Sequence, residues 1–141
     1  MANANEEVTL LLVEDDDIDA MTIERSIVKQ RIRNAVVRAH DGLEALELLR
    51  AGKVQKPYNI LLDLQMPRMN GFEFLDEVRK DENLTDSVVF ILTTSADQKD
   101  LAAGYEHHVA GYFVKDATGP LFIDLINALD HYWKVVHLPV T

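Results

Sequence analysis

The feature that most constrains the fold of this chain is a regular alternation of two kinds of segment. Short apolar runs, typical of buried strands, are separated by stretches in which apolar residues recur at helical spacing. The apolar runs lie at residues 9–13, 35–39, 58–62, 88–92 and 111–114, and the helical stretches at residues 18–28, 43–50, 72–80, 98–108 and 121–133. This alternation predicts stacked β–α units around a parallel sheet, not an all-α or all-β protein. Arg38 interrupts the second run, which is typical of an edge strand.

Composition narrows the class of protein further. The 141 residues and the 48% hydrophobic content fit one globular domain, and the absence of cysteine excludes disulfides and thiolate chemistry. No apolar run approaches the roughly 20 residues that span a bilayer, and residues 1–7 are too polar and acidic for a secretory leader. The net charge of −10 opposes binding to nucleic acid or to anionic membranes. We therefore expect a cytoplasmic protein that binds neither, and whose partners are neutral or basic proteins.

Polar and charged residues follow the predicted strands at the point where each strand ends. Glu14 and Asp15 follow the first strand, Asp63 the third, Thr93 the fourth and Lys115 the fifth. Because ligands of open parallel sheets bind outside the carboxyl ends of the strands, we expect these residues to share one crevice. Neighbouring carboxylates repel each other unless a cation neutralises them, and an all-oxygen site suits Mg²⁺. With a lysine and a threonine hydroxyl beside it, such a site would hold a phosphoryl group.

Two stretches resemble the receiver domains of two-component response regulators. Residues 11–16, Leu-Leu-Val-Glu-Asp-Asp, resemble the acidic end of the first strand in that family. Residues 62–71, Leu-Asp-Leu-Gln-Met-Pro-Arg-Met-Asn-Gly, resemble its phosphoacceptor motif, and the spacings to Thr93 and Lys115 are similar to those of chemotaxis-type receivers. The resemblance covers residues 8–133. It implies an α/β, flavodoxin-like fold, with a doubly wound five-stranded parallel sheet in the order 2-1-3-4-5 and helices on both faces.

The resemblance also implies a role for each site residue. Asp63 would be the phosphoacceptor, a nucleophile that takes a phosphoryl group from a sensor histidine kinase. Asp15, Asp63 and the backbone carbonyl of Gln65 would bind Mg²⁺, and Glu14 would act through a bound water. The protein would then be no enzyme with a separate substrate, but a switch that catalyses its own phosphotransfer and dephosphorylation.

Three further residues would read the phosphoryl group or pair with it. Lys115 would pair with the phosphoryl oxygens, and Thr93 would move toward the group after transfer. Tyr112 would follow Thr93 inward and so reshape a protein-binding surface, although an aromatic residue in the fifth strand also fits a simple core position.

Three positions depart from the usual pattern of the family. Glu14 stands where many receivers carry aspartate, and a carboxylate that acts through water should tolerate the extra length. Thr94 is larger than the alanine, serine or glycine usual after the switch threonine, so we expect it to restrict the access of phosphodonors to Asp63. Asp116 replaces the proline that commonly follows the lysine. Because a non-proline cis peptide costs about 3 kcal/mol, the cis bond of the family is not expected here.

Other interpretations of the same residues stay open. Residues 15–17 also suit the N-cap of the following helix. A Mg²⁺-dependent phosphohydrolase of the haloacid dehalogenase type would also use Asp63, but it carries a general-acid aspartate where this chain has Gln65. A flavin carrier would need a phosphate-binding loop rich in small residues after the first strand, where this chain is acidic. We interpret His107 and His108 as surface or packing residues, since no acidic partner lies at ligand spacing.

The end of the chain is more apolar than the sheet requires. The last helical stretch carries apolar residues on more than one face: Leu121, Phe122, Ile123, Leu125, Ile126 and Leu129. Residues 92–95 and 132–139 resemble the single-domain response regulators that work with bacterial and cyanobacterial phytochromes. We therefore expect a receiver domain at residues 8–133 and an apolar interface arm at residues 134–141. Two copies of the chain would form a homodimer through residues 121–133 and the arm. The alternative is an arm that folds back on the last helix of its own chain.

No DNA-binding or catalytic output segment follows the predicted receiver in this sequence. We therefore expect a stand-alone receiver that is phosphorylated by a sensor histidine kinase, with a bacteriophytochrome as the implied kinase. Its output would be a protein-interaction surface that engages a downstream protein or a phosphotransfer partner.

Overall fold

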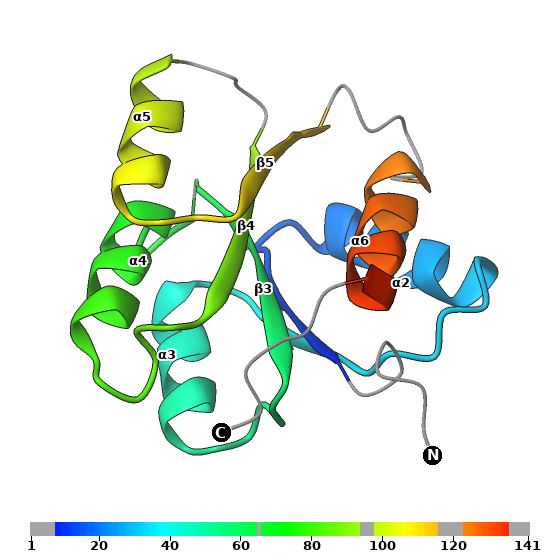
Figure 1. Cartoon of the computed structure of the whole chain (residues 1–141), viewed down its shortest axis with the longest axis horizontal. Helices are drawn as coiled ribbons and strands as arrows, with labels where there is room; N and C mark the ends of the chain where they lie inside the picture. Colours follow the sequence, from blue (N-terminus) through cyan, green and yellow to red (C-terminus); the bar gives the residue numbers. More distant parts are fainter. Residues whose placement is uncertain (1–7, 65, 94–97, 116–122, 136–141) are drawn as a thin grey trace.

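Strands and helices alternate along the whole described part of the chain (Figure 1). The computed structural model describes residues 8–64, 66–93, 98–115 and 123–135. The strands are β1 (Thr9–Val13), β2 (Val36–Ala39), β3 (Tyr58–Asp63), β4 (Val88–Thr93) and β5 (Gly111–Val114). The helices are α2 (Asp17–Lys29), α3 (Gly42–Arg50), α4 (Gly71–Lys80), α5 (Gln98–Glu106) and α6 (Ile123–Val135). The predicted alternation is confirmed.

The strands form one parallel sheet in the order β2-β1-β3-β4-β5. The chain runs outward from β1 to β2 and then crosses back to β3, so the strand order reverses between β1 and β3. The strand that contains Arg38 lies at an edge, as predicted. This topology is the flavodoxin-like order that the family resemblance implied, and its ligand crevice is expected at the ends of β1 and β3.

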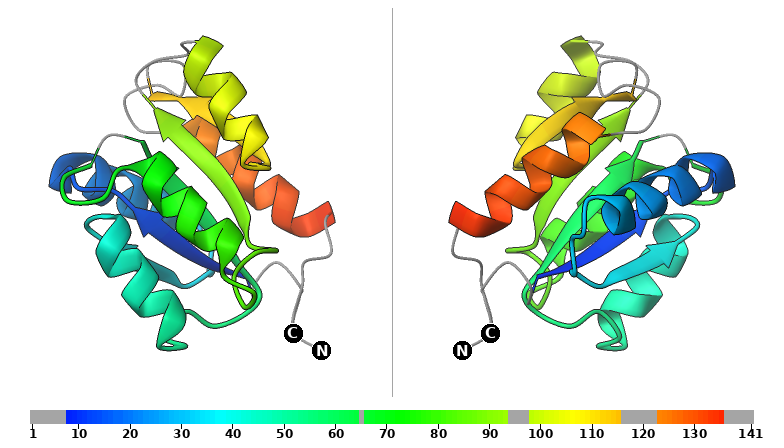
Figure 2. Two further views of the ribbon diagram at one scale, coloured as in Figure 1. Left: turned by 90° about the vertical axis from the view of Figure 1, so that its left-hand side faces the viewer. Right: turned by 90° about the vertical axis from the view of Figure 1, so that its right-hand side faces the viewer.

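Helices cover both faces of the sheet, with α3, α4 and α5 on one face and α2 and α6 on the other (Figure 2). Alternate side chains of the strands supply the two cores. Leu11 and Ile60 belong to the core under α3 and α4, whereas Leu12 and Leu61 belong to the core under α2 and α6. Every residue of β1 and β3 is buried, which explains why these runs are apolar on both faces.

Polar caps decide where two of the helices beside the crevice begin. Asp16 Oδ1 accepts the backbone N–H groups of Ile18 and Asp19, so Asp16 is the N-cap of α2. Asn70 caps α4 in a capping box with Glu73. The N-cap interpretation of the acidic run is therefore correct for Asp16, and it leaves Glu14 and Asp15 outside the helix.

Two strands end one residue later than predicted. Asp63 pairs with Leu92 as the last residue of β3, and Thr93 pairs with Val114 as the last residue of β4. Both site residues are therefore held by the sheet and not by a loop.

The helix predicted at residues 98–108 ends at Glu106 instead. His108 has a φ of 59°, and Arg79 on α4 donates to the carbonyls of His107 and His108, so the chain turns there. His107 packs against the ring of Phe72, in agreement with its interpretation as a packing residue.

The surplus apolar face predicted for the last helix is wrong where the structure describes it. Leu125, Ile126 and Leu129 are fully buried against the sheet of the same chain. Trp133 is equally buried, and its indole N–H donates to Asn59 in the middle of the sheet. The helical spacing counted these residues as extra because it could not show that α6 packs across both the sheet and α2. Leu121 and Phe122 lie outside the described residues.

None of the helices described above combines the length and the apolar character that crossing a bilayer requires.

Candidate functional site

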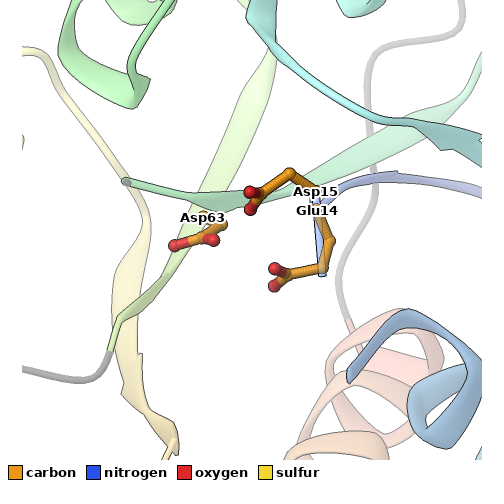
Figure 3. A group of neighbouring side chains, drawn as sticks. All are labelled: Glu14, Asp15 and Asp63. Carbon is orange, nitrogen blue, oxygen red and sulfur yellow. The ribbon is translucent and has the colours of Figure 1, made fainter. Parts of the chain in front are cut away.

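Three carboxylates meet where β1 and β3 end (Figure 3). Glu14 and Asp15 follow β1, and Asp63 closes β3, the strand paired beside it. One carboxylate oxygen from each residue lies within 4.8 Å of the others. Glu14 and Asp63 are buried, whereas Asp15 is exposed at the mouth of the site. The predicted acidic cluster is therefore present, and one of its members faces solvent.

Burial strongly perturbs the carboxyl group of Glu14. Its pKa is raised to about 8, first because the group is buried and then because the Asp63 carboxylate lies beside it. One oxygen, Oε1, accepts the backbone N–H of Asp16 at 3.2 Å. The other, Oε2, is buried and faces the Lys115 ammonium at 3.2 Å. A buried carboxylate oxygen among other acidic groups fits a site that holds a hard divalent cation.

Lys115 supplies the positive charge of the site. Its Nζ lies 3.8 Å from Asp63 Oδ2 and 3.2 Å from Glu14 Oε2. A shorter contact, 2.8 Å, joins it to Asp19 Oδ2 on α2. Burial lowers the pKa of Lys115, but the hydrogen bond to Asp19 and the charges of Glu14 and Asp63 outweigh burial and raise it. Asp19 is a member of the site that the sequence analysis missed.

Arg38 positions the loop that carries the two acidic residues after β1. Its guanidinium donates through Nε and Nη2 to the backbone carbonyl of Glu14, at 3.2 and 2.9 Å. The same guanidinium pairs with Asp17 at 2.8 Å. From the sequence, Arg38 indicated only an edge strand. Its position along the chain does not predict a hydrogen bond to the Glu14 carbonyl at the end of β1.

The loop between β3 and α4 is fastened to the start of α3. Arg68 Nε lies 2.6 Å from Asp41 Oδ2, and this hydrogen bond lowers the pKa of Asp41. The Gly71 N–H donates to the Leu64 carbonyl and closes the loop. A Cβ on Gly71 would stand 2.8 Å from Leu64 Cα, so only glycine permits this approach. Gln65, the predicted carbonyl ligand, lies outside the described residues.

Thr93 and Tyr112 lie on neighbouring strands beside the site. Thr93 is buried at the end of β4, and Val114, its partner in the sheet, directly precedes Lys115. Tyr112 is half-buried beneath α5, where its hydroxyl donates to the Leu101 carbonyl at 3.4 Å. Thr94 and Asp116, the two departures from the family pattern beside these residues, lie outside the described part of the chain.

The tyrosine fits under α5 because Gly104 leaves room for it. A Cβ on Gly104 would overlap the Tyr112 hydroxyl and stand 3.0 Å from Ile91 Cδ1. Helix propensity alone predicts that Gly104→Ala stabilises the protein by about 1 kcal/mol. We expect the opposite, a loss of about 1 to 3 kcal/mol in the free energy of unfolding, because the added methyl group overpacks the contact.

Urea unfolding of two variants measures this effect. Adding Tyr112→Phe, which removes the overlapping hydroxyl, should restore part of the stability lost in Gly104→Ala. A stabilised Gly104→Ala variant would contradict the packing of Tyr112 under α5.

Comparisons with known proteins agree with this geometry. The model of the response regulator receiver domain family matches residues 10–127. Response regulator Rcp1 from Synechocystis sp. is 30% identical over 141 residues, and the match covers 96% of this chain and 96% of that protein.

Two solved structures are similar to this chain over almost their whole length. The phosphorylated cyanobacterial phytochrome response regulator RcpA has a TM-score of 0.83 at 30% identity, with 93% of this chain and 97% of that chain covered. The Mn²⁺-bound form of Rcp1 has a TM-score of 0.81 at 30% identity, with 93% and 98% covered.

Proposed function

Because the chain belongs to the response regulator receiver domain family, we propose that it is a signalling switch whose Asp63 accepts a phosphoryl group from a sensor histidine kinase. One observation carries the proposal. The buried Asp63 carboxylate ends a central strand, with two acidic side chains on one side and the Lys115 ammonium 3.8 Å away. This arrangement combines a nucleophile with a counter-charge for the oxygens of an incoming phosphoryl group.

Transfer of the phosphoryl group requires only one new covalent bond to the chain. An oxygen of Asp63 forms a bond to phosphorus, and the bond from phosphorus to the histidine nitrogen of the donor breaks, with the electron pair left on that nitrogen. Lys115 balances the negative charge of the transferred group. The sheet holds Asp63 in place, because its backbone is paired with Leu92 in β4.

The acidic cluster supports a divalent cation, Mg²⁺, as the cofactor. Asp15, Asp63 and the backbone carbonyl of Gln65 would hold it, and Glu14 would reach it through a water. A cation there would neutralise the charge that builds up as the phosphoryl group approaches. The gathering of three carboxylates and the all-oxygen donor set favour such an ion. The similar protein Rcp1 has been solved in a Mn²⁺-bound form.

The output would be a change on the surface formed by α5, β5 and α6. Thr93 would approach the phosphoryl group, and Tyr112 would respond beneath α5, whose Gly104 it contacts. A downstream protein or a phosphotransfer partner would read this change in the cytoplasm.

A phytochrome-type sensor histidine kinase is the kinase that the relatives favour, because the similar protein RcpA is a phytochrome response regulator. The test is phosphotransfer. Autophosphorylated kinases of the phytochrome class and of an unrelated sensor class are mixed with the protein in Mg²⁺, and the loss of label from each kinase is followed over seconds. Rapid transfer from the phytochrome kinase alone supports the assignment. Equal or slower transfer than from the unrelated kinase contradicts it.

Variants of Lys115 and Thr93 should distinguish phosphoryl uptake from the conformational response that follows it. Because Lys115 balances the charge of the phosphoryl group, Lys115→Ala should slow uptake from acetyl phosphate by about tenfold or more. Thr93→Ala should keep uptake within about threefold of the wild type, because the hydroxyl acts only after transfer. Uptake is measured by phosphate-affinity electrophoresis, and the switch by the response of Tyr112 in NMR spectra. A phosphorylated Thr93→Ala variant whose Tyr112 responds like the wild type would contradict the switch role.

We also propose that residues 8–133 form the receiver and that residues 134–141 act as an arm in a homodimer. Trp133 is buried in its own chain, but Val135 is exposed, and the residues beyond it are mostly apolar. Each branched side chain that an arm buries would contribute roughly 1.5 to 3 kcal/mol.

Truncation after Lys134 should therefore convert a dimer to a monomer in sedimentation experiments at micromolar concentration. The urea unfolding of the truncated monomer should remain cooperative, which serves as the control for folding. A full-length protein that is monomeric with and without a phosphoryl group would refute the homodimer.

A further inference from the structure

Among Glu14, Asp63 and Asp19, the residue nearest to the lysine of the site is Asp19, which lies outside the acidic cluster. Lys115 Nζ donates to Asp19 Oδ2 at 2.8 Å, whereas its distances to Glu14 and Asp63 are 3.2 and 3.8 Å. The Lys115 side chain is only 13% exposed, and that of Asp19 is 26% exposed, so water screens this pair only partly. The ammonium therefore lies nearer to α2 than to the candidate phosphoacceptor.

Asp19 is suited to hold the lysine because α2 fixes its position. It lies in the first turn of α2, and its backbone N–H donates to the N-cap residue Asp16. Its carboxylate is not among the three whose oxygens gather at the ends of β1 and β3. Asp19 can thus bind Lys115 without being needed by a cation in that cluster.

We propose that Asp19 is a positioning residue that holds the Lys115 ammonium in the unphosphorylated protein and competes for it with the phosphoryl group arriving on Asp63. The proposal deepens, and rests on, the function proposed above. Of its contacts with Asp19, Glu14 and Asp63, the hydrogen bond that Lys115 donates to Asp19 is the shortest. To reach the oxygens on Asp63, the ammonium has to exchange this short bond for new ones. The need for this exchange slows uptake.

The reaction used for the test is uptake from acetyl phosphate in Mg²⁺. An Asp63 oxygen forms a bond to phosphorus, the bond from phosphorus to the acetyl oxygen breaks, and acetate leaves with the electron pair. Asp19→Asn keeps the size of the side chain and removes its charge. We expect uptake to become about 3- to 10-fold faster at low salt, roughly the effect of releasing the lysine from one partly exposed ion pair.

Two variants show whether the gain depends on charge at this position. Asp19→Glu, which keeps the charge, should behave like the wild type. Glu24→Gln removes one charge further along α2 and should also leave uptake within about twofold of the wild type, because a half-exposed charge more than one helical turn from Asp19 is largely screened.

Coupling to the lysine separates positioning from a general change in charge or stability. In a Lys115→Gln background, Asp19→Asn should change uptake less than about twofold, because Asp19 then has no ammonium to hold. The same gain in both backgrounds would overturn the proposal, as would an Asp19→Asn variant that reacts at the wild-type rate or more slowly.

A second measurement needs no phosphoryl group. In ¹⁵N-labelled protein, the hydrogen-bonded Lys115 ammonium should give a signal that Asp19→Asn moves or broadens and that Glu24→Gln leaves in place. An unmoved signal would overturn the holding role. A wild-type protein that takes up no phosphoryl group from acetyl phosphate would instead overturn the proposed function itself, so the two failures are distinct.

Discussion

Replacement of Asp63 by asparagine is expected to reduce phosphoryl uptake to background, a loss of roughly 100-fold or more. An amide oxygen is no nucleophile toward phosphorus at neutral pH, and the neighbouring carboxylates of Glu14 and Asp15 are carried by the chain after β1, not by β3. Uptake is measured with labelled acetyl phosphate in Mg²⁺ and again in EDTA. The wild type should lose its uptake in EDTA, because three carboxylates within 4.8 Å then lack a neutralising cation.

A matched variant shows that the loss is specific. Asp76→Asn also converts an aspartate to its amide, but Asp76 is exposed on α4, where it pairs with Lys80 and His107. It should take up the phosphoryl group like the wild type. Label that survives in Asp63→Asn would contradict the assignment of Asp63 as the nucleophile. Label that persists unchanged in EDTA would contradict the assignment of a divalent cation.

Loss of Trp133 is expected to have the largest effect on stability. The side chain is fully buried between α6 and the sheet, and its N–H donates to Asn59, which is also fully buried. Trp133→Ala should lower the free energy of unfolding by about 3 to 5 kcal/mol because it leaves a cavity. Trp133→Phe should cost less, about 1 to 3 kcal/mol, because it mainly leaves the Asn59 oxygen without a partner.

Urea unfolding followed by circular dichroism tests the ranking. His131→Gln, at an exposed position on the same helix, should change stability by less than about 0.5 kcal/mol. Combining Trp133→Phe with Asn59→Leu should cost less than the sum of the single changes, because neither polar partner then remains unsatisfied. Strict additivity would contradict a buried hydrogen bond between the two residues.

The strands and helices could largely be predicted from the sequence, because buried segments are visibly apolar in it. The strands β1 and β3 are covered by helices on both faces, so their central residues, 10–13 and 60–62, are consecutive apolar residues and do not alternate with polar ones. The gathering of Glu14, Asp15 and Asp63 followed from the same reasoning, because parallel neighbours end at the same edge. The strand order itself came only from the family resemblance.

The contacts that position the site could not be predicted in the same way. Lys115 and Asp19 are 96 positions apart in the sequence. Neither segment contains a pattern that predicts a hydrogen bond between the lysine and a side chain of α2. Arg38 and Arg68 act through long side chains that cross from one strand end or loop to another. The apolar face of α6 was misjudged for a related reason, since helical spacing reports how many residues are apolar but not how wide a surface they cover.

The measurement that tests the central claim most directly is to locate the phosphoryl group on the wild-type protein. The chain is incubated with acetyl phosphate and Mg²⁺, the acyl phosphate is trapped by borohydride reduction, and the peptides are sequenced by mass spectrometry. We predict one phosphoryl group per chain, at Asp63. A phosphoryl group trapped at Glu14, Asp15 or Asp19, or a folded protein that carries none in the presence of Mg²⁺, would contradict the account.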